Sequence, residues 1–320
     1  MPAPIESAPL FQAQWPRSLD PALRPITEKV SKVFWNIISI VIFPIGLVRL
    51  ARSFISQVAF KVIIPGSLDY TDKLEIHTPI KTPDGAIIDS VFVKGKHPDK
   101  VVLFEGGNCE MYETSCPDWF DRIAPVGASL LFLNPRGVGL SRGMLNSEGY
   151  ALDVYAAAEY LIQEKGIDPE NILFAGFSMG AANTTRGAAL IQEKYPDKKI
   201  SALNINSFSS LETEIYYAAG RLAYLGSKLF GLNKDVKKAW DTLKGEKVIL
   251  HNPNDPVIPL PAQLATAVKK DPIGTTRILE LSSEATHFGL EGKTLELALR
   301  HLLNSPSWWF SPAKLTGVTV

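Results

Sequence analysis

The sequence has no excess of charge of either sign, and it contains few cysteines and histidines. Lys plus Arg and Asp plus Glu each number 33 in 320 residues, so the formal net charge is zero. Nucleic-acid binding depends on a strongly basic surface, so we expect no nucleic-acid partner. Two cysteines cannot build a disulfide framework, and the five histidines lack the spacing of metal ligands. We therefore expect neither a metal site nor another cofactor.

The rest of the composition is that of a globular protein. Hydrophobic residues make up 46% of the chain and charged residues 21%, which are ordinary values for a folded domain. A chain of this length can form one large domain with insertions or two smaller ones.

Residues 33–48 form one unusually apolar segment, VFWNIISIVIFPIGLV, with lysines before it and arginines after it. It lies too far from the N-terminus for a cleavable signal peptide, and it is shorter than the roughly 20 residues that span a bilayer. Three interpretations stay open: contact with a membrane surface, a buried helix covering the domain, and a true span. Membrane association and a cytoplasmic location are both compatible with this segment.

The order of sequence patterns predicts an α/β fold. A proline-rich irregular arm (1–28) and the apolar helical segment (29–66) precede a domain at 67–304, and a tail follows at 305–320. The domain begins with a β-hairpin that turns at 83–85, and a second turn is expected at 97–100. Strands are expected at 101–104, 128–134, 171–177, 200–206, 248–254 and 275–281, and helices at 147–165, 179–194, 261–268 and 290–303. This alternation predicts a mostly parallel sheet with helices on both faces and an antiparallel N-terminal hairpin.

Residues 208–246 interrupt this alternation with a long aromatic stretch. We interpret it as a helical lid inserted over the carboxyl edge of the sheet. Its apolar side chains, Tyr216 and Tyr217 among them, either pack into a core or face an acyl chain of a substrate.

Gly176–Gly180 reads GFSMG, which matches the pattern G-x-S-x-G. The pentapeptide alone is weak evidence, but it follows an apolar strand and opens a helix rich in small residues. That context is the sharp turn that exposes a nucleophilic serine at the end of a strand. We therefore predict Ser178 as a nucleophile.

A serine hydroxyl needs a base, and in this chain order the acid and then the histidine follow the serine. His287 lies in a loop after the last predicted strand, and Asp255 follows the strand at 248–254. We predict His287 as the base and Asp255 as the carboxylate that orients it. Asp241 and Glu284 are weaker candidates because neither closes a strand.

An oxyanion formed at Ser178 requires two backbone N–H donors. We predict the N–H of Met179, directly after the nucleophile, and the N–H of Asn108, in the loop Glu105–Cys109. Gly107 in the same loop allows close approach of a substrate. Arg136 follows another strand and either fixes its loop or contacts an anionic group.

Five segments occur in an order and context similar to those of the α/β-hydrolase superfamily: FEGGN, NPRGVGLS, GFSMG, DPVIP and THFG. The segments IVIFPIGLVRL, FEGGNCEMYE and NSFSSLE also resemble bacterial hydrolases of the chlamydial CHLPS type and SidB-like effectors. The superfamily resemblance implies a serine hydrolase acting on a small-molecule or lipid ester. The narrower resemblance implies secretion by a bacterium toward a host.

The residues alone leave the activity open between three classes. The first is hydrolysis of a carboxylic ester or thioester through an acyl-enzyme on Ser178. The second is acyl transfer through the same intermediate, and the third is a binding protein on the same fold whose triad is inactive.

Overall fold

The computed structural model describes residues 10–21, 78–108, 110–229, 235–268, 275–281, 286–288, 290 and 292–303. The apolar segment at 33–48 and the tail at 305–320 lie outside these ranges, so the interpretations given for them stay predictions. Within the described ranges, no helix combines the length and the hydropathy needed to cross a membrane.

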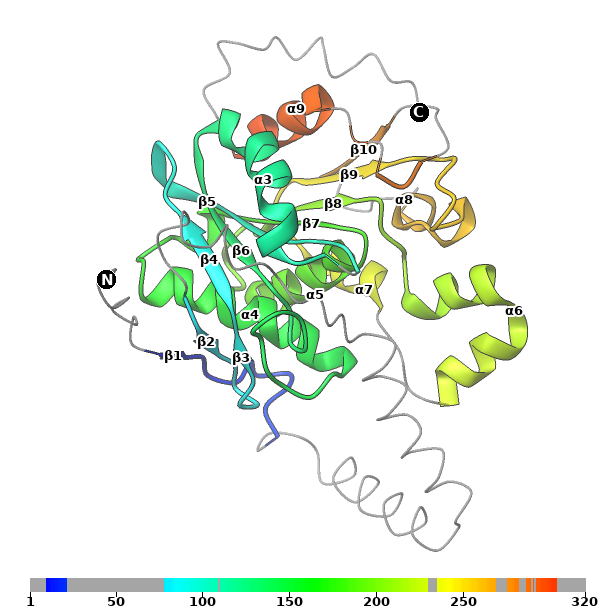
Figure 1. Cartoon of the computed structure of the whole chain (residues 1–320), viewed down its shortest axis with the longest axis horizontal. Coiled ribbons are helices and arrows are strands. Elements are labelled where there is room, and N and C mark those ends of the chain that lie inside the picture. The colour runs from blue at the N-terminus through cyan, green and yellow to red at the C-terminus, as the bar shows by residue number, and fades with distance from the viewer. Residues whose placement is uncertain are drawn as a thin grey trace, which may run out of the picture.

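A seven-stranded sheet forms the centre of the molecule (Figure 1). Its strands are β4 (Ser90–Val93), β5 (His97–Glu105), β6 (Ala128–Leu133), β7 (Ile172–Phe177), β8 (Ser201–Ile205), β9 (Lys247–His251) and β10 (Thr276–Glu280). Their order is β10-β9-β8-β7-β5-β6-β4. Only β4 is antiparallel to its neighbour, so the predicted mostly parallel sheet is confirmed.

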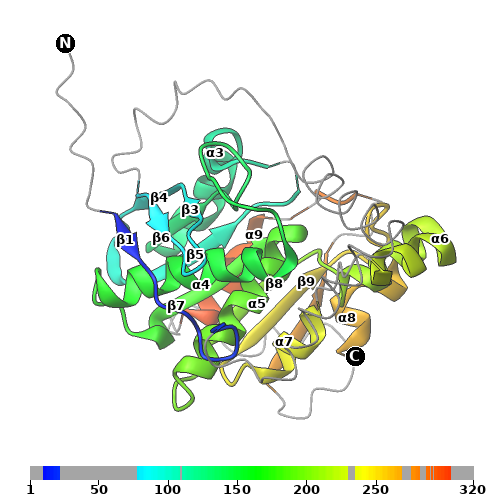
Figure 2. The ribbon, with the colours of Figure 1, turned by 90° about the horizontal axis from the view of Figure 1, so that it is seen from below.

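Helices cover both faces of this sheet (Figures 1 and 2). Helices α3 (Tyr112–Ile123) and α9 (Gly292–Leu302) lie on one face, and α4 (Ser147–Gln163), α5 (Met179–Lys194) and α7 (Val236–Thr242) lie on the other. Successive residues of β5 show why its run is continuously apolar. Val101 and Leu103 belong to the core beneath α4 and α5, whereas Val102 and Phe104 belong to the core beneath α3 and α9.

A small second sheet lies beside α4 and corrects the prediction of an irregular arm. It consists of β1 (Phe11–Gln12), β2 (Ile80–Lys81) and β3 (Ile87–Ile88). Strands β2 and β3 form the predicted hairpin, and β1 adds to β2 in parallel. Phe11 is buried, and its ring lies 5.7 Å from that of Tyr160. This aromatic contact ties one part of the arm to the domain.

Two further local predictions are wrong, and one helix was missed. Residues 97–100 belong to β5, whose register shifts between His97 and Val101, and do not form a turn. The helix expected at 261–268 is a 3₁₀ turn, η4 (Leu260–Ala262), followed by the short α8 (Leu264–Ala267). The helix α3 was not expected at all, although buried Tyr112, Trp119 and Ile123 recur on its sheet-facing side.

The remaining elements are short turns and the predicted helical insertion. The turns are η2 (Ala124–Val126) and η3 (Pro169–Asn171). The insertion contains α6 (Leu211–Leu229), which follows β8 and is interrupted at Gly220, where φ is 82°. Figure 1 shows α6 projecting beyond the end of the sheet. It follows β8 and contacts η4, which follows β9, so it lies at the carboxyl ends of these two strands.

The order of strands defines a topological switch point between β5 and β7. Strands β5 and β7 are neighbours, and the chain proceeds from β5 to one side and from β7 to the other. In parallel sheets ligands bind outside the carboxyl ends of strands at such a switch point. The loop after β5 and the turn after β7, where the candidate residues lie, meet at this point.

Candidate active site

The turn between β7 and α5 holds Ser178 in an unusual backbone conformation. Ser178 has φ 52° and ψ −118°, one of two positive φ values at non-glycine residues within the described part of the chain. Such a conformation costs energy for a residue with a Cβ atom. Its amide donates to the Ile205 carbonyl of β8 at 2.8 Å, which fixes the turn against the neighbouring strand.

The two glycines of GFSMG are required by close backbone approach. A Cβ atom on Gly180 would lie 2.1 Å from the carbonyl oxygen of Gly106, and one on Gly176 would lie 2.6 Å from the amide of Ala181. Neither site can hold a larger residue without movement of the backbone. The first turn of α5 therefore packs directly on the backbone of the loop after β5.

His287 and Asp255 are brought together from segments 32 residues apart. His287 Nδ1 lies 2.6 Å from Asp255 Oδ2, and both side chains are buried. The other oxygen of Asp255 accepts the N–H groups of Val257 at 2.7 Å and Ile258 at 3.0 Å. These bonds fix the carboxylate so that one oxygen faces the imidazole. Asp255 lies in the turn after β9 and not, as expected, at the end of the strand.

Asn206 holds the histidine loop, and sequence reasoning missed it. Its side-chain amide donates to the His287 carbonyl at 2.8 Å, and its side-chain oxygen accepts the Asn252 amide at 2.9 Å. Asn206 follows β8 directly and has φ 46°. An asparagine directly after a buried strand is the available sequence signal, because asparagine tolerates the left-handed conformation.

The serine and histidine loops meet through Phe177 and β8. The ring of Phe177, directly before Ser178, lies 4.8 Å from the imidazole of His287. The Ser178 amide is bonded to Ile205, and the carbonyl of His287 is bonded to the next residue, Asn206. In the described part of the chain, the Ser178 hydroxyl makes no hydrogen bond to His287. In active sites such bonds are often long until a substrate binds.

The loop after β5 is closed by the side chain of Glu110. Glu110 Oε2 accepts the Gly107 N–H at 2.5 Å, and the Glu110 N–H donates to the Gly107 carbonyl at 3.1 Å. Burial raises the pKa of Glu110, although its bond to the Gly107 N–H acts in the opposite direction. Asn108 is exposed in the same loop. The roles predicted for Gly107 and for the Met179 and Asn108 amides stay predictions.

A buried polar cluster joins the start of α3 to the loop after β6. Tyr112 donates its hydroxyl to Asp89 at 2.6 Å and its backbone N–H to the Asn134 side chain at 2.9 Å. The Asn134 amide in turn donates to Glu113 at 2.7 Å, and Ser141 donates to the Asn134 carbonyl at 2.7 Å. The segments FEGGNCEMYE and NPRGVGLS are thus held together by their own side chains.

Arg136 fixes its loop and is not placed to contact an anionic group of a substrate, which were the two roles expected for it. Its guanidinium is 1% exposed and lies 2.7 Å from Asp153 and 2.6 Å from Asp84. Burial would raise the pKa of Asp84, but its bonds to Arg136 and Thr82 and the charge of Arg136 together lower it. The ion pairs tie the loop after β6 to α4 and to the hairpin turn.

Helix α6 carries the two tyrosines predicted to contact substrate. Tyr216 and Tyr217 are 43% and 48% exposed, with ring centroids 5.1 Å apart. They are therefore not core residues, whereas the neighbouring Ile215 packs against the core. Glu214, on the same helix, has a buried oxygen without a hydrogen-bond partner. Burial and the nearby charge of Asp255 raise the pKa of Glu214 to about 7.

The described residues contain no group of three or more His, Cys, Asp or Glu side chains arranged to hold a metal ion.

Comparison with solved structures shows that the chain has the α/β-hydrolase fold. An α/β hydrolase from Vibrio vulnificus aligns with 93% of this chain and 97% of its own, at 16% identity and a TM-score of 0.60. The esterase Pf2001 of Pyrococcus furiosus aligns with 76% of this chain and 95% of its own, at 17% identity and a TM-score of 0.57. Acetyl xylan esterase 1 of a Thermoanaerobacterium species covers 69% of this chain and 80% of its own, at 19% identity and a TM-score of 0.51.

Similarity to curated sequences is more limited, and no family model matches the chain. A multifunctional-autoprocessing repeats-in-toxin protein of Vibrio cholerae is 38% identical over 93 residues, which are 28% of this chain and 2% of the toxin. The uncharacterized protein R595 of Acanthamoeba polyphaga mimivirus is 24% identical over 198 residues, 57% of this chain and 65% of its own length.

Proposed function

We propose that this protein is a serine hydrolase that cleaves a carboxylic ester or thioester. The observation that carries the proposal is the convergence of a strained serine turn and a buried His287–Asp255 pair at the switch point of the sheet. Solved esterases with the same fold support this class of reaction.

The reaction follows from the roles of the three side chains. Ser178 Oγ attacks the carbonyl carbon while His287 Nε2 takes the hydroxyl proton, and Asp255 stabilises the imidazolium through Nδ1. His287 then gives that proton to the departing alcohol or thiol as the bond to the acyl carbon breaks. Water, deprotonated by His287, then attacks the acyl-enzyme. The bond between the acyl carbon and Ser178 Oγ breaks as His287 returns the proton to Oγ, which releases the carboxylic acid and free Ser178. In each step the Met179 and Asn108 amides hold the oxyanion.

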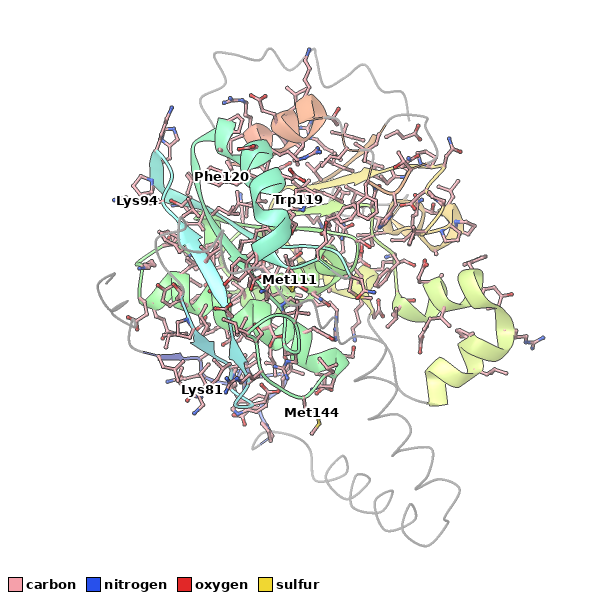
Figure 3. All side chains as sticks on the ribbon, viewed as in Figure 1. Lys81, Lys94, Met111, Trp119, Phe120 and Met144 are labelled. Atoms are coloured by element: carbon pink, nitrogen blue, oxygen red, sulfur yellow. The ribbon has the colours of Figure 1, made fainter. Side chains whose placement is uncertain are left out.

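The exposed apolar side chains favour a substrate with an apolar acyl group. Apart from Leu10, the large exposed hydrophobic side chains of the described residues all lie in connections that leave the carboxyl ends of strands. They are Leu140, Met144, Tyr216, Tyr217, Leu225, Val257, Leu260 and Phe288. Met144, at 73% exposed, projects away from the body of the protein (Figure 3). We therefore propose acyl or lipid esters as substrates, because exposed apolar side chains in these connections offer contacts to an acyl chain.

Fluorophosphonate labelling tests the reaction class and the nucleophile together. We expect the full chain to be labelled at Ser178 and to hydrolyse short p-nitrophenyl esters, and Ser178→Ala to lose both properties. A wild-type protein that takes no label would instead favour the inactive binding protein. A series of esters with increasing acyl length tests the substrate, since a lack of gain beyond short chains would contradict the apolar acyl group.

Secretion toward a host and contact with a membrane through 33–48 stay predictions. The resemblance to SidB-like and chlamydial hydrolases supports the former, and the 93-residue match to a bacterial toxin agrees with it.

A further inference from the structure

The loop that follows β5 carries an acidic side chain that the proposed reaction does not use. Glu110 lies two residues after the predicted donor Asn108 and is partly buried. Two reciprocal hydrogen bonds join it to Gly107: the carboxylate accepts the Gly107 N–H at 2.5 Å, and the Gly107 carbonyl accepts the Glu110 N–H at 3.1 Å. A glutamate that reaches back to the N–H three residues earlier closes the chain in the same way at the start of many helices.

The glycine pair in this loop leaves space for that carboxylate. A Cβ atom on Gly106 would lie 2.8 Å from Glu110 Oε2, and one on Gly107 would lie 3.0 Å from the ring of Phe177 and 3.4 Å from the same oxygen. The loop is therefore packed between the Glu110 carboxyl group, the aromatic ring next to Ser178, and the first turn of α5 at Gly180. Its backbone has little freedom as long as this carboxyl group is in place.

Aromatic packing connects the loop after β5 to the reacting centre. The ring of Phe177, which a Cβ atom on Gly107 would approach to 3.0 Å, lies 5.7 Å from the Trp119 ring of α3, labelled in Figure 3, and 4.8 Å from the imidazole of His287. The charged groups that act on Glu110 are His287, from the loop after β10, and Asp118, from α3. His287 in turn faces the Asp255 carboxylate.

We propose that Glu110 is a positioning residue that fixes the oxyanion loop by holding the Gly107 N–H, so that the Asn108 N–H is the loop amide presented to the substrate. This inference rests on the proposed serine-hydrolase function and assigns the device that preorganises one of its donors. Preorganisation matters because a donor stabilises the transition state fully only when it need not reorient during the reaction. A displacement of about 1 Å in such a group can cost on the order of 100-fold in rate.

Paired substitutions at Glu110 separate hydrogen bonding from charge. In Glu110→Gln the amide oxygen can still accept the Gly107 N–H, whereas in Glu110→Asp the carboxylate is one methylene too short to reach it. With p-nitrophenyl butyrate and the full chain, we expect kcat/KM of Glu110→Gln to stay within about threefold of wild type. For Glu110→Asp we expect kcat to fall about 10- to 100-fold with KM little changed. Glu164→Gln, at an exposed position after α4, serves as the control.

The split between kcat and KM supplies a readout that a merely structural role would not move. A loop that no longer presents its donor in the right place lowers kcat, whereas KM depends on substrate contacts made elsewhere. Recovery of kcat/KM in Glu110→Gln would tie the loss in Glu110→Asp to the missing hydrogen bond with Gly107.

The outcomes distinguish the inference from the function on which it rests. If wild type is labelled by fluorophosphonate and Glu110→Asp is as active as wild type, the positioning role is overturned. A gain of activity in Glu110→Asp would also overturn it, because the carboxylate would then be blocking the oxyanion site. If wild type takes no label and cleaves no ester, both proposals fall. If Glu110→Asp unfolds, as circular dichroism would show, a loss of activity in Glu110→Gln overturns the inference on its own, because the amide oxygen can still accept the Gly107 N–H.

Discussion

His287 Nδ1 lies 2.6 Å from Asp255 Oδ2 in a buried pair whose second carboxylate oxygen is bonded to two backbone amides. The pair therefore fixes both the orientation and the tautomer of the imidazole. In Asp255→Asn the side chain keeps its size but can present an N–H to the ring. We expect kcat for p-nitrophenyl esters to fall by on the order of 10³- to 10⁴-fold.

The matched control for Asp255 is Asp241→Asn. Asp241 lies on α7 in an exposed ion pair with Lys237, and the sequence made it a competing candidate. Its substitution should leave kcat unchanged. Equal losses in the two variants would contradict the assignment of Asp255.

The backbone strain at Ser178 predicts that glycine is a more stable replacement for this residue than alanine. Glycine adopts positive φ without the cost that a Cβ atom imposes, so Ser178→Gly should exceed Ser178→Ala in free energy of unfolding by about 1 kcal/mol. Both variants should be inactive. Urea unfolding measures the difference, and a more stable Ser178→Ala would show that the turn is not strained. Ala189→Gly, inside the regular part of α5, should show the ordinary loss of about 0.5–1 kcal/mol.

The sequence predicted the central sheet because its strands are buried on both faces. The apolar runs around Val101 and Ile172 and the helices between them follow directly from that burial. Strand β1 could not be predicted, because Phe11 and Gln12 are too few to show a period and become a strand only by pairing with β2. Helix α3 was hidden by the glycine-rich loop before it and by Pro117 within it.

The sequence predicted the site residues that directly follow apolar strands. It did not predict residues whose role depends on contacts between segments that meet only in the folded chain. Ser178, Asp255 and His287 could be picked out by their order and their position after apolar runs. Asn206 and Glu110 have no motif of their own, and their partners, His287 and Gly107, become evident only when loops meet or a turn closes. The role of Arg136 depended in the same way on Asp84 and Asp153, which no sequence pattern joins to it.

The contact between α5 and the loop after β5 predicts a severe effect at Gly180. A methyl group there would lie 2.1 Å from the Gly106 carbonyl oxygen and 2.3 Å from that of Glu105. Gly180→Ala should therefore displace the oxyanion loop, with a loss of about 1–3 kcal/mol in free energy of unfolding and a fall in kcat. Gly292→Ala is the control, since a Cβ atom there meets no atom within 4 Å. Thermal unfolding and ester kinetics on both variants would refute the contact if Gly180→Ala behaved like Gly292→Ala.

The raised pKa of Glu214, at the start of α6, predicts how the stability of the protein depends on pH. Burial and the charge of Asp255 raise its pKa from 4.5 to about 7 in the folded protein. The folded state therefore binds the proton more tightly than the unfolded state, so this group's contribution to stability is largest below pH 4.5. That contribution declines as the pH rises from 4.5 through 7. Glu214→Gln removes the ionisation, so relative to wild type it should gain stability between pH 5 and pH 8. After allowance for solvent screening, we expect a gain on the order of 1 kcal/mol. Glu212→Gln, two residues earlier on α6, is the control and should show no such gain. Urea unfolding at both pH values decides the point, and parallel pH dependence in wild type and Glu214→Gln would show that Glu214 does not titrate in this range.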